Sequence, residues 1–209
     1  GFTAAAVVLY WGYAFGARVV LRRLATNGDG GLTVATFERL PDSFGRLGSL
    51  ATWTAAAFLA ASLIARWRAV GHAPWSNMWE FTVAFAGGVM LFYIIFERWS
   101  GQRALGAFIQ PVVLALMAVS AAFFPSDVRP LVPALQNQDL LAIHVAMMIL
   151  AYSALSVSFG AGVMYLLQGG ERNRFPRLPK ASVLDEIGYR SVMVGFPLLA
   201  LGIALGAYW

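Results

Sequence analysis

Residues 130–167 read PLVPALQNQDLLAIHVAMMILAYSALSVSFGAGVMYLL, a polar segment containing two prolines followed by a long apolar run. From Asp139 to Leu167 the run contains no proline and a single charge, at its first residue. A helix of this length extends roughly 40 Å at ~1.5 Å per residue, more than the ~30 Å hydrocarbon core of a bilayer. The run therefore predicts a membrane-spanning helix, with Asp139 in the first turn, where a carboxylate suits the helix dipole.

His144 lies about one turn inside this predicted helix and is one of only two histidines in the chain. We expect it at the membrane boundary, with Met147, Met148 and Tyr152 at helical spacing on the same face. A polar residue inside a membrane span points to a functional site. A histidine near the headgroups also serves to bond a neighbouring helix. Position alone leaves both hypotheses open.

The composition is that of an integral membrane protein. Of the 209 residues, 59% are hydrophobic and 12% are charged, whereas a soluble domain averages about 25% charged residues. The chain contains no cysteine, which excludes a disulfide framework, a thiolate metal site and a cysteine nucleophile. The first residue is glycine and apolar sequence follows at once, so we expect no signal peptide and an N-terminus that has been cut.

The apolar segments predict an all-α fold, a single transmembrane domain over residues 1–209. It is expected to be a polytopic bundle of about six helices, with short surface helices in the loops at Leu32–Leu40 and Ser182–Tyr189. Gly202 and Gly206 form a small-residue pair that favours close helix packing. The six predicted spans are residues 2–21, 48–65, 79–96, 104–124, 140–168 and 190–208.

The segment Ala65–Glu80, ARWRAVGHAPWSNMWE, contains three tryptophans and the second histidine, His72. Tryptophans at the level of the headgroups are typical of an aromatic belt. Ser76 or Asn77 is expected to cap the following helix, with Glu80 near its third position. We expect His72 to cap this loop rather than to bind a ligand.

Positive charges are distributed unequally between the two sides of the membrane. With the six spans taken in order, loops 1–2, 3–4 and 5–6 and the adjoining span ends carry twelve arginines and lysines, and the other two loops carry three. Cytoplasmic loops are enriched in these residues, so the side with His72, His144 and Trp209 is predicted to face outward. Topology thus explains the net charge of +5 without nucleic acid.

The residue types on the outer side limit the chemistry. The spans contain no serine–histidine–aspartate set and no metal triad, whereas haem needs only one or two axial ligands. An apolar slot with His144 at its rim, roofed by Trp75 and Trp79, would suit a porphyrin. The porphyrin's propionates would then pair with Arg66, Arg68 or Arg129. Any other amphiphile of this shape fits the same description.

Three sequence blocks and their spacing over six spans carry a resemblance to a known family. The blocks are ARWRAVGHAPWSNMWEF at 65–81, LVPALQNQDLLAIHVAMMILAYSAL at 131–155 and LDEIGYRSVMVGFPLLALGIALGAYW at 184–209. The sequence resembles the CcsA/ResC family, the membrane haem-handling subunit of System II cytochrome c biogenesis. The similarity covers nearly the whole chain from about Leu50 onward.

The resemblance implies haem handling: the binding, export or presentation of haem b at the outer face of the bacterial inner (cytoplasmic) membrane or the thylakoid membrane. A ResB/Ccs-one-type membrane partner and apocytochrome c are the implied partners, in a holocytochrome c synthase that attaches haem to two cysteines. By match to the IHV block, His144 is the first of two outward-facing histidines that ligate haem iron. The resemblance also implies that a WGxYWxWD signature follows Trp209, so that the chain is C-terminally incomplete relative to the family.

Two other classes of function are compatible with the residues. One is a small-solute transporter, although no ionisable residue lies at the midplane of a span, where transporter sites usually lie. The other is a structural subunit of a membrane redox complex. The glycine pairs fit that class as they fit any helical bundle.

Overall fold

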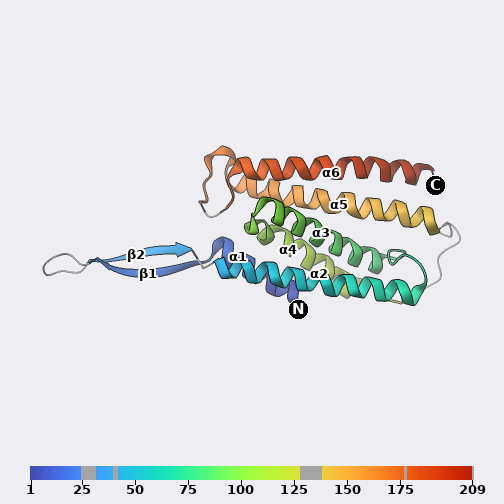
Figure 1. Cartoon of the computed structure of the whole chain (residues 1–209), viewed down its shortest axis with the longest axis horizontal. Helices are drawn as coiled ribbons and strands as arrows, with labels where there is room; N and C mark the ends of the chain where they lie inside the picture. The colour runs from blue at the N-terminus through green and yellow to red at the C-terminus, as the bar shows by residue number, and fades with distance from the viewer. Residues whose placement is uncertain (25–31, 40–41, 128–137, 177, 209) are drawn as a thin grey trace.

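The chain folds as an all-α polytopic bundle with one projecting β-hairpin (Figure 1), which confirms the predicted fold class. The computed structural model describes residues 1–24, 32–39, 42–127, 138–176 and 178–208. Within these residues, five helices are long and apolar enough to cross a membrane. The elements are α1 (Phe2–Phe15), β1 (Ala17–Leu24), β2 (Leu32–Arg39), α2 (Asp42–Val70), α3 (Met78–Ser100), η1 (Arg103–Leu105), α4 (Gly106–Phe123), α5 (Gln138–Leu167), η3 (Gly170–Arg172) and α6 (Ala181–Tyr208).

Helix α1 is shorter than the first predicted span, because it ends at Phe15 after 14 residues. At ~1.5 Å per residue it extends roughly 21 Å, less than the ~30 Å hydrocarbon core. The chain then enters β1, which pairs with β2 in an antiparallel hairpin running from Ala17↔Arg39 to Leu24↔Leu32. The prediction of a surface helix at Leu32–Leu40 is therefore wrong. Valine, threonine and phenylalanine in this segment favour a strand, and pairing with β1 satisfies its backbone.

The second predicted surface helix, Ser182–Tyr189, is also wrong as a separate element. It forms the first turns of α6, which continues without a break from Ala181 to Tyr208. No proline or glycine occurs between Ala181 and Gly188, so nothing ends the helix there. A helix of 28 residues extends roughly 42 Å, so about two turns of α6 reach beyond a ~30 Å core.

Helix α3 lies at the centre of the bundle, in contact with α2, α4 and α5, whereas α6 packs mainly on α5 (Figure 1). The inner face of α3 is buried, with Ala86, Val89 and Tyr93 fully inaccessible. The spacing of three to four residues between these side chains is that of one helical face. The pair α5–α6 therefore forms a flank of the bundle, joined to the centre through α5.

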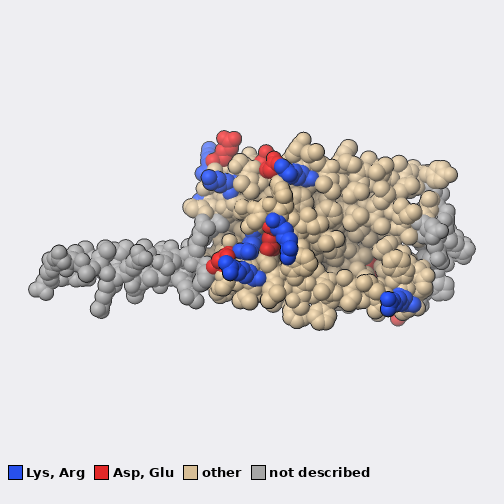
Figure 2. Space-filling view, in the orientation of Figure 1, with Lys and Arg blue, Asp and Glu red and all other residues tan. Residues whose placement is uncertain are grey.

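The helices alternate in direction, so the bundle has two ends of different composition. At the His144 end, α2, α4 and α6 finish and α3 and α5 begin (Figure 1). The opposite end, here called the arginine-rich end, is where most of the charged side chains gather in Figure 2. Its described arginines are Arg46, Arg98, Arg103, Arg172, Arg174 and Arg190. The loops therefore group at the two ends as the order of spans predicts.

A proline in α4 leaves a backbone carbonyl free to accept a hydrogen bond from α1. Pro111 lies inside the helix and has no N–H, so the carbonyl of Ala107, four residues earlier, has no intrahelical donor. The indole Nε1 of Trp11 in α1 donates to this carbonyl at 2.8 Å. Ala107 is buried, and a buried carbonyl without a donor costs about 1–3 kcal/mol. Helix α1 thus supplies the hydrogen bond that the sequence of α4 removes.

Candidate functional site at the His144 end

His144 lies in the second turn of α5, half-buried, with its imidazole against α6. Its Nδ1 is 2.7 Å from the backbone carbonyl oxygen of Gly202. A carbonyl oxygen only accepts, so Nδ1 carries the hydrogen and donates it. In the neutral imidazole the lone pair is then on Nε2. Nε2 has no hydrogen-bond partner among the residues that the structure describes.

The glycine pair of α6 makes room for this arrangement. A Cβ at Gly206 would lie 2.6 Å from Cε1 of His144, and a Cβ at Gly202 would lie 2.6 Å from the sulfur of Met148. Both distances are below van der Waals contact, so a larger residue at either position would displace the side chain of Met148 or of His144. The predicted packing role of Gly202 and Gly206 is confirmed, and His144 does bond a neighbouring helix.

The start of α3 is capped as the sequence predicts, with Asn77 rather than Ser76 as the N-cap. The side-chain Oδ1 of Asn77 accepts from the backbone N–H of Glu80 at 2.8 Å. In return, Oε2 of Glu80 accepts from the backbone N–H of Ser76 at 3.0 Å. The arrangement satisfies the N–H of Glu80, which the first turn of the helix leaves free, and the N–H of Ser76, which directly precedes the N-cap.

Glu80 is also half of a buried ion pair. Its carboxylate is 1% exposed, and its Oε1 accepts from Nε of Arg66 at 2.8 Å. The guanidinium of Arg66 lies over the ring of Trp79, 5.4 Å from the ring centroid. Arg66 therefore compensates a buried carboxylate, and a ligand carboxylate at this position would compete with Glu80 for the same charge.

The other predicted residues of the loop are held by local contacts. Nδ1 of His72 lies 3.1 Å from the carbonyl oxygen of Ala73 and 3.0 Å from Oγ of Ser76, a loop-capping arrangement. The ring of Trp75 contacts that of Trp67 with centroids 6.3 Å apart. The indole Nε1 of Trp75 is buried and has no hydrogen-bond partner in the described part of the chain.

The structure thus brings together Arg66, Trp79 and Glu80, and separately places His144 against α6. In the ranges that the structure describes, no hydrogen bond, ion pair or ring contact joins His144 to this loop. No group of three metal-binding side chains occurs there either, so His144 offers a metal one nitrogen. Arg129 lies outside the described residues.

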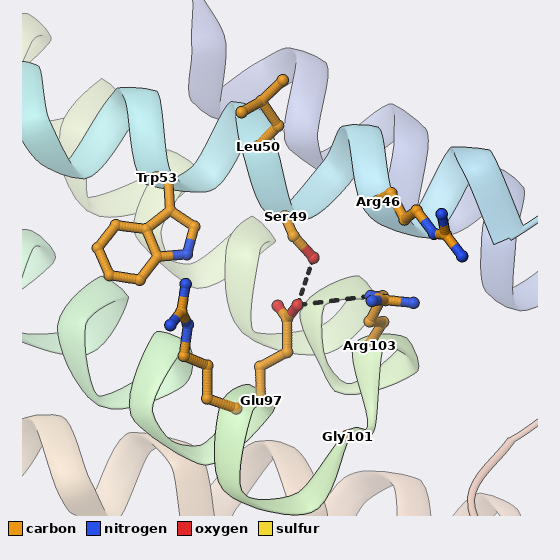
Figure 3. A pocket seen from close by; sticks show the side chains of 8 residues that line it. Arg46, Ser49, Leu50, Trp53, Glu97, Gly101 and Arg103 are labelled. Carbon is orange, nitrogen blue, oxygen red and sulfur yellow. Dashed lines mark hydrogen bonds and ion pairs between the residues drawn. The ribbon is translucent and has the colours of Figure 1, made fainter.

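Sequence analysis missed a polar cluster at the arginine-rich end (Figure 3). Glu97 of α3 accepts hydrogen bonds from the hydroxyl of Tyr10 at 3.0 Å and from that of Ser49, and its Oε1 lies 3.7 Å from Nε of Arg103. The network continues inward through Thr52, to which Gln110 Nε2 donates at 3.2 Å. These residues come from four α-helices and from η1 and share no local motif, so only the fold brings them together.

Comparison with known proteins gives a consistent result. Residues 75–209 match the family described as Cytochrome C assembly protein. Cytochrome c biogenesis protein CcsA of Synechococcus sp. (strain JA-2-3B'a(2-13)) is 30% identical over 72% of this chain and 61% of the relative. The protein of the same name from Synechococcus elongatus is 30% identical over 72% of this chain and 62% of the relative. The protein of the same name from Guillardia theta is 29% identical over 69% of this chain and 56% of the relative.

No solved structure matches the chain. The chain spans 56% to 62% of the length of these curated relatives. The matched region begins at Trp75 and includes α3, α4, α5 and α6, with the candidate histidine and the glycine pair that packs on it. The chain therefore belongs to the cytochrome c assembly protein family, and is similar to its CcsA members.

Proposed function

We propose that this chain binds haem b as cargo and presents it at the outer face of the membrane for attachment to apocytochrome c. Membership of the cytochrome c assembly family supports this proposal, as does the name of the CcsA relatives. The part assigned to this chain is non-covalent, with Nε2 of His144 as an axial ligand of the haem iron. The covalent step belongs to the complex with its partners.

The hydrogen bond from His144 to Gly202 is the observation that carries the assignment. Histidines that ligate metals almost always donate the other ring N–H to a carbonyl or a carboxylate, which orients the ring and selects the tautomer. Here Nδ1 donates to the carbonyl of Gly202 at 2.7 Å. Nε2 is thereby left as the nitrogen with a free lone pair, as ligation of iron requires.

The test is haem content in the full chain purified with its membrane partner. We expect His144→Gly to lose the b-type absorbance, and added imidazole to restore it by replacing the ligand. The matched control is His72→Gly, which removes the other histidine and should retain haem. If His144→Gly keeps its haem, the ligand assignment is wrong. It is also wrong if the variant is folded and added imidazole does not restore the haem spectrum.

We also propose an orientation, in which the His144 end faces the periplasm or the thylakoid lumen. The concentration of arginines at the opposite end supports it (Figure 2). Because the chain contains no cysteine, single cysteines report topology without background. Ala69→Cys at the His144 end should react with an impermeant maleimide in intact cells, and Glu171→Cys at the other end only after permeabilisation. The reverse pattern would contradict the orientation.

The proposed partners are a ResB/Ccs-one-type membrane protein and apocytochrome c. A structural role is the second candidate, because the same bond from His144 to Gly202 also ties α5 to α6. The two roles differ in what the intact complex contains. A stoichiometric complex that lacks haem, yet is destabilised by His144→Gly, would favour the structural role.

A further inference from the structure

A pocket of about 580 Å³ lies between α2 and α3 at the arginine-rich end (Figure 3). It is at the opposite end of the bundle from the start of α5, which carries His144. Glu97 and Ser49 line it, and their side chains point toward each other in Figure 3. Neither the haem proposal nor the packing of the core uses this pocket. The remaining lining residues are Arg46, Leu50, Trp53, Arg98, Gly101 and Arg103.

The pocket has an excess of positive charge. Asp42, beside it, is shared by two guanidinium groups: Nε of Arg46 at 3.0 Å and Nη1 of Arg103 at 2.8 Å. Glu97 is also engaged, because it accepts from two hydroxyl groups and lies near Arg103. Arg98 has no carboxylate partner within the described ranges. Among the side chains that the structure describes, three guanidinium groups thus face two carboxylates that are already bonded.

Arg98 is held in place by an aromatic ring rather than by a carboxylate. Its guanidinium carbon lies over the ring of Trp53, 4.8 Å from the ring centroid. A stacked guanidinium keeps its N–H groups free at the edge, where they can bind phosphate oxygens in a bidentate manner. The stacking therefore orients a charged donor without consuming its hydrogen-bonding capacity.

An apolar surface continues from the charged rim along α2. Leu50 is 60% exposed and Trp53 is 44% exposed. With Arg46 they are spaced four and three residues apart, so all three lie on one face of the helix. Moving along α2 from Arg46 toward Trp53 leads from the end of the bundle toward its middle. Arg46 lies at the end of the bundle, whereas Arg98, stacked on Trp53, lies further in, next to the exposed apolar side chains. A guanidinium beside exposed apolar side chains matches the headgroup and the acyl chain of a lipid.

We propose that this pocket binds an anionic phospholipid, with Arg98 on the phosphate group, an acyl chain along Leu50 and Trp53, and Arg46 adding positive charge at the rim. The excess positive charge selects a headgroup with a net negative charge over a zwitterionic one. Glu97 does not oppose this binding strongly, because its carboxylate is directed to Tyr10, Ser49 and Arg103. The site is independent of haem and of His144.

The experiment titrates the full chain, in a neutral detergent, with phosphatidylglycerol and with phosphatidylcholine, and follows bound lipid by native mass spectrometry. We expect phosphatidylglycerol to bind about tenfold more tightly, because both lipids offer the phosphate but the arginines repel the choline cation of phosphatidylcholine. Arg98→Gln should abolish that preference. The matched control is Arg172→Gln, an exposed arginine of η3 at the same end that does not line the pocket.

Three outcomes would overturn the proposal. The first is equal binding of the two lipids by the unmodified chain, and the second is equal loss of the preference in Arg98→Gln and Arg172→Gln. The third comes from a separate titration with inorganic phosphate. If millimolar phosphate displaces phosphatidylglycerol completely from the unmodified chain, the pocket is a free-phosphate site and not a lipid site. Arg98→Gln is compared only after gel filtration shows the same folded species as the unmodified chain.

Discussion

The two ends of the bundle stabilise their charges in different ways. At the arginine-rich end, carboxylates have several partners: Asp42 is bonded by Arg46 and Arg103, and its side chain is 46% exposed. At the His144 end, the carboxylate of Glu80 is 1% exposed and its described cation is Arg66, itself 18% exposed. Shared, solvated partners can replace one another, whereas a single buried pair cannot. The two ends should therefore differ in their tolerance to substitution.

The largest expected effect is that of Arg66→Gln. It leaves the carboxylate of Glu80 buried without its cation, which typically costs about 3–5 kcal/mol of stability. The same substitution at the other end, Arg46→Gln, removes a cation that is 74% exposed and should cost at most ~1 kcal/mol. Detergent-induced unfolding followed by tryptophan fluorescence measures both. Equal losses would show that the two ends do not differ as described.

A smaller effect is expected from Gly206→Ala, which tests the packing around the candidate ligand. The added methyl group meets the imidazole of His144, and overpacking of this kind costs about 1–3 kcal/mol. The control is Gly162→Ala in α5, where a Cβ meets nothing within 4 Å. That variant should gain ~0.5–1 kcal/mol, because alanine favours a helix more than glycine does.

If His144 ligates haem, Gly206→Ala should also shift the absorption maximum of bound haem, because it moves the ring. Gly162→Ala should leave the spectrum unchanged. A stability loss in Gly206→Ala with an unaltered spectrum would mean that the glycine serves only the packing of α5 on α6.

The smallest expected effect concerns the two ends of α3. At the His144 end the helix begins with a side-chain cap, and Asn77→Ala should cost about 1 kcal/mol. Asn77→Ser keeps an oxygen acceptor and should stay within a few tenths of the unmodified chain. At the other end the helix is capped by Gly101, whose backbone N–H donates to the carbonyl of Glu97 and whose φ of 69° suits glycine. Unfolding measurements on the two Asn77 variants separate the cap from other effects of substitution.

Local patterns in the sequence were sufficient for most of the fold. Long apolar runs predict α2 to α6, and the S-N-x-x-E pattern around Asn77 predicts the start of α3. The hairpin was missed because segment Leu32–Arg39 has both an amphipathic helical pattern and β-forming side chains. Its conformation depends on pairing with β1, a partner that a local pattern does not reveal.

The candidate site around His144 was predictable only in part, because its hydrogen-bond partner comes from another helix. The position of His144 in a membrane span singles it out in the sequence. Its hydrogen-bond partner, a backbone carbonyl at Gly202, carries no sequence signal and depends on how α5 is aligned with α6. The pocket at the arginine-rich end is similar, since Ser49 and Glu97 lie on different helices 48 residues apart.

The bond from Trp11 to Ala107 has a consequence for how α1 can move within the bundle. The preceding residue, Tyr10, donates to Glu97 of α3, so two successive residues of α1 are bonded to two different helices. A hydrogen bond weakens steeply when its distance or its angle changes. Helix α1 therefore cannot slide or rotate against α3 and α4 without breaking one of these bonds.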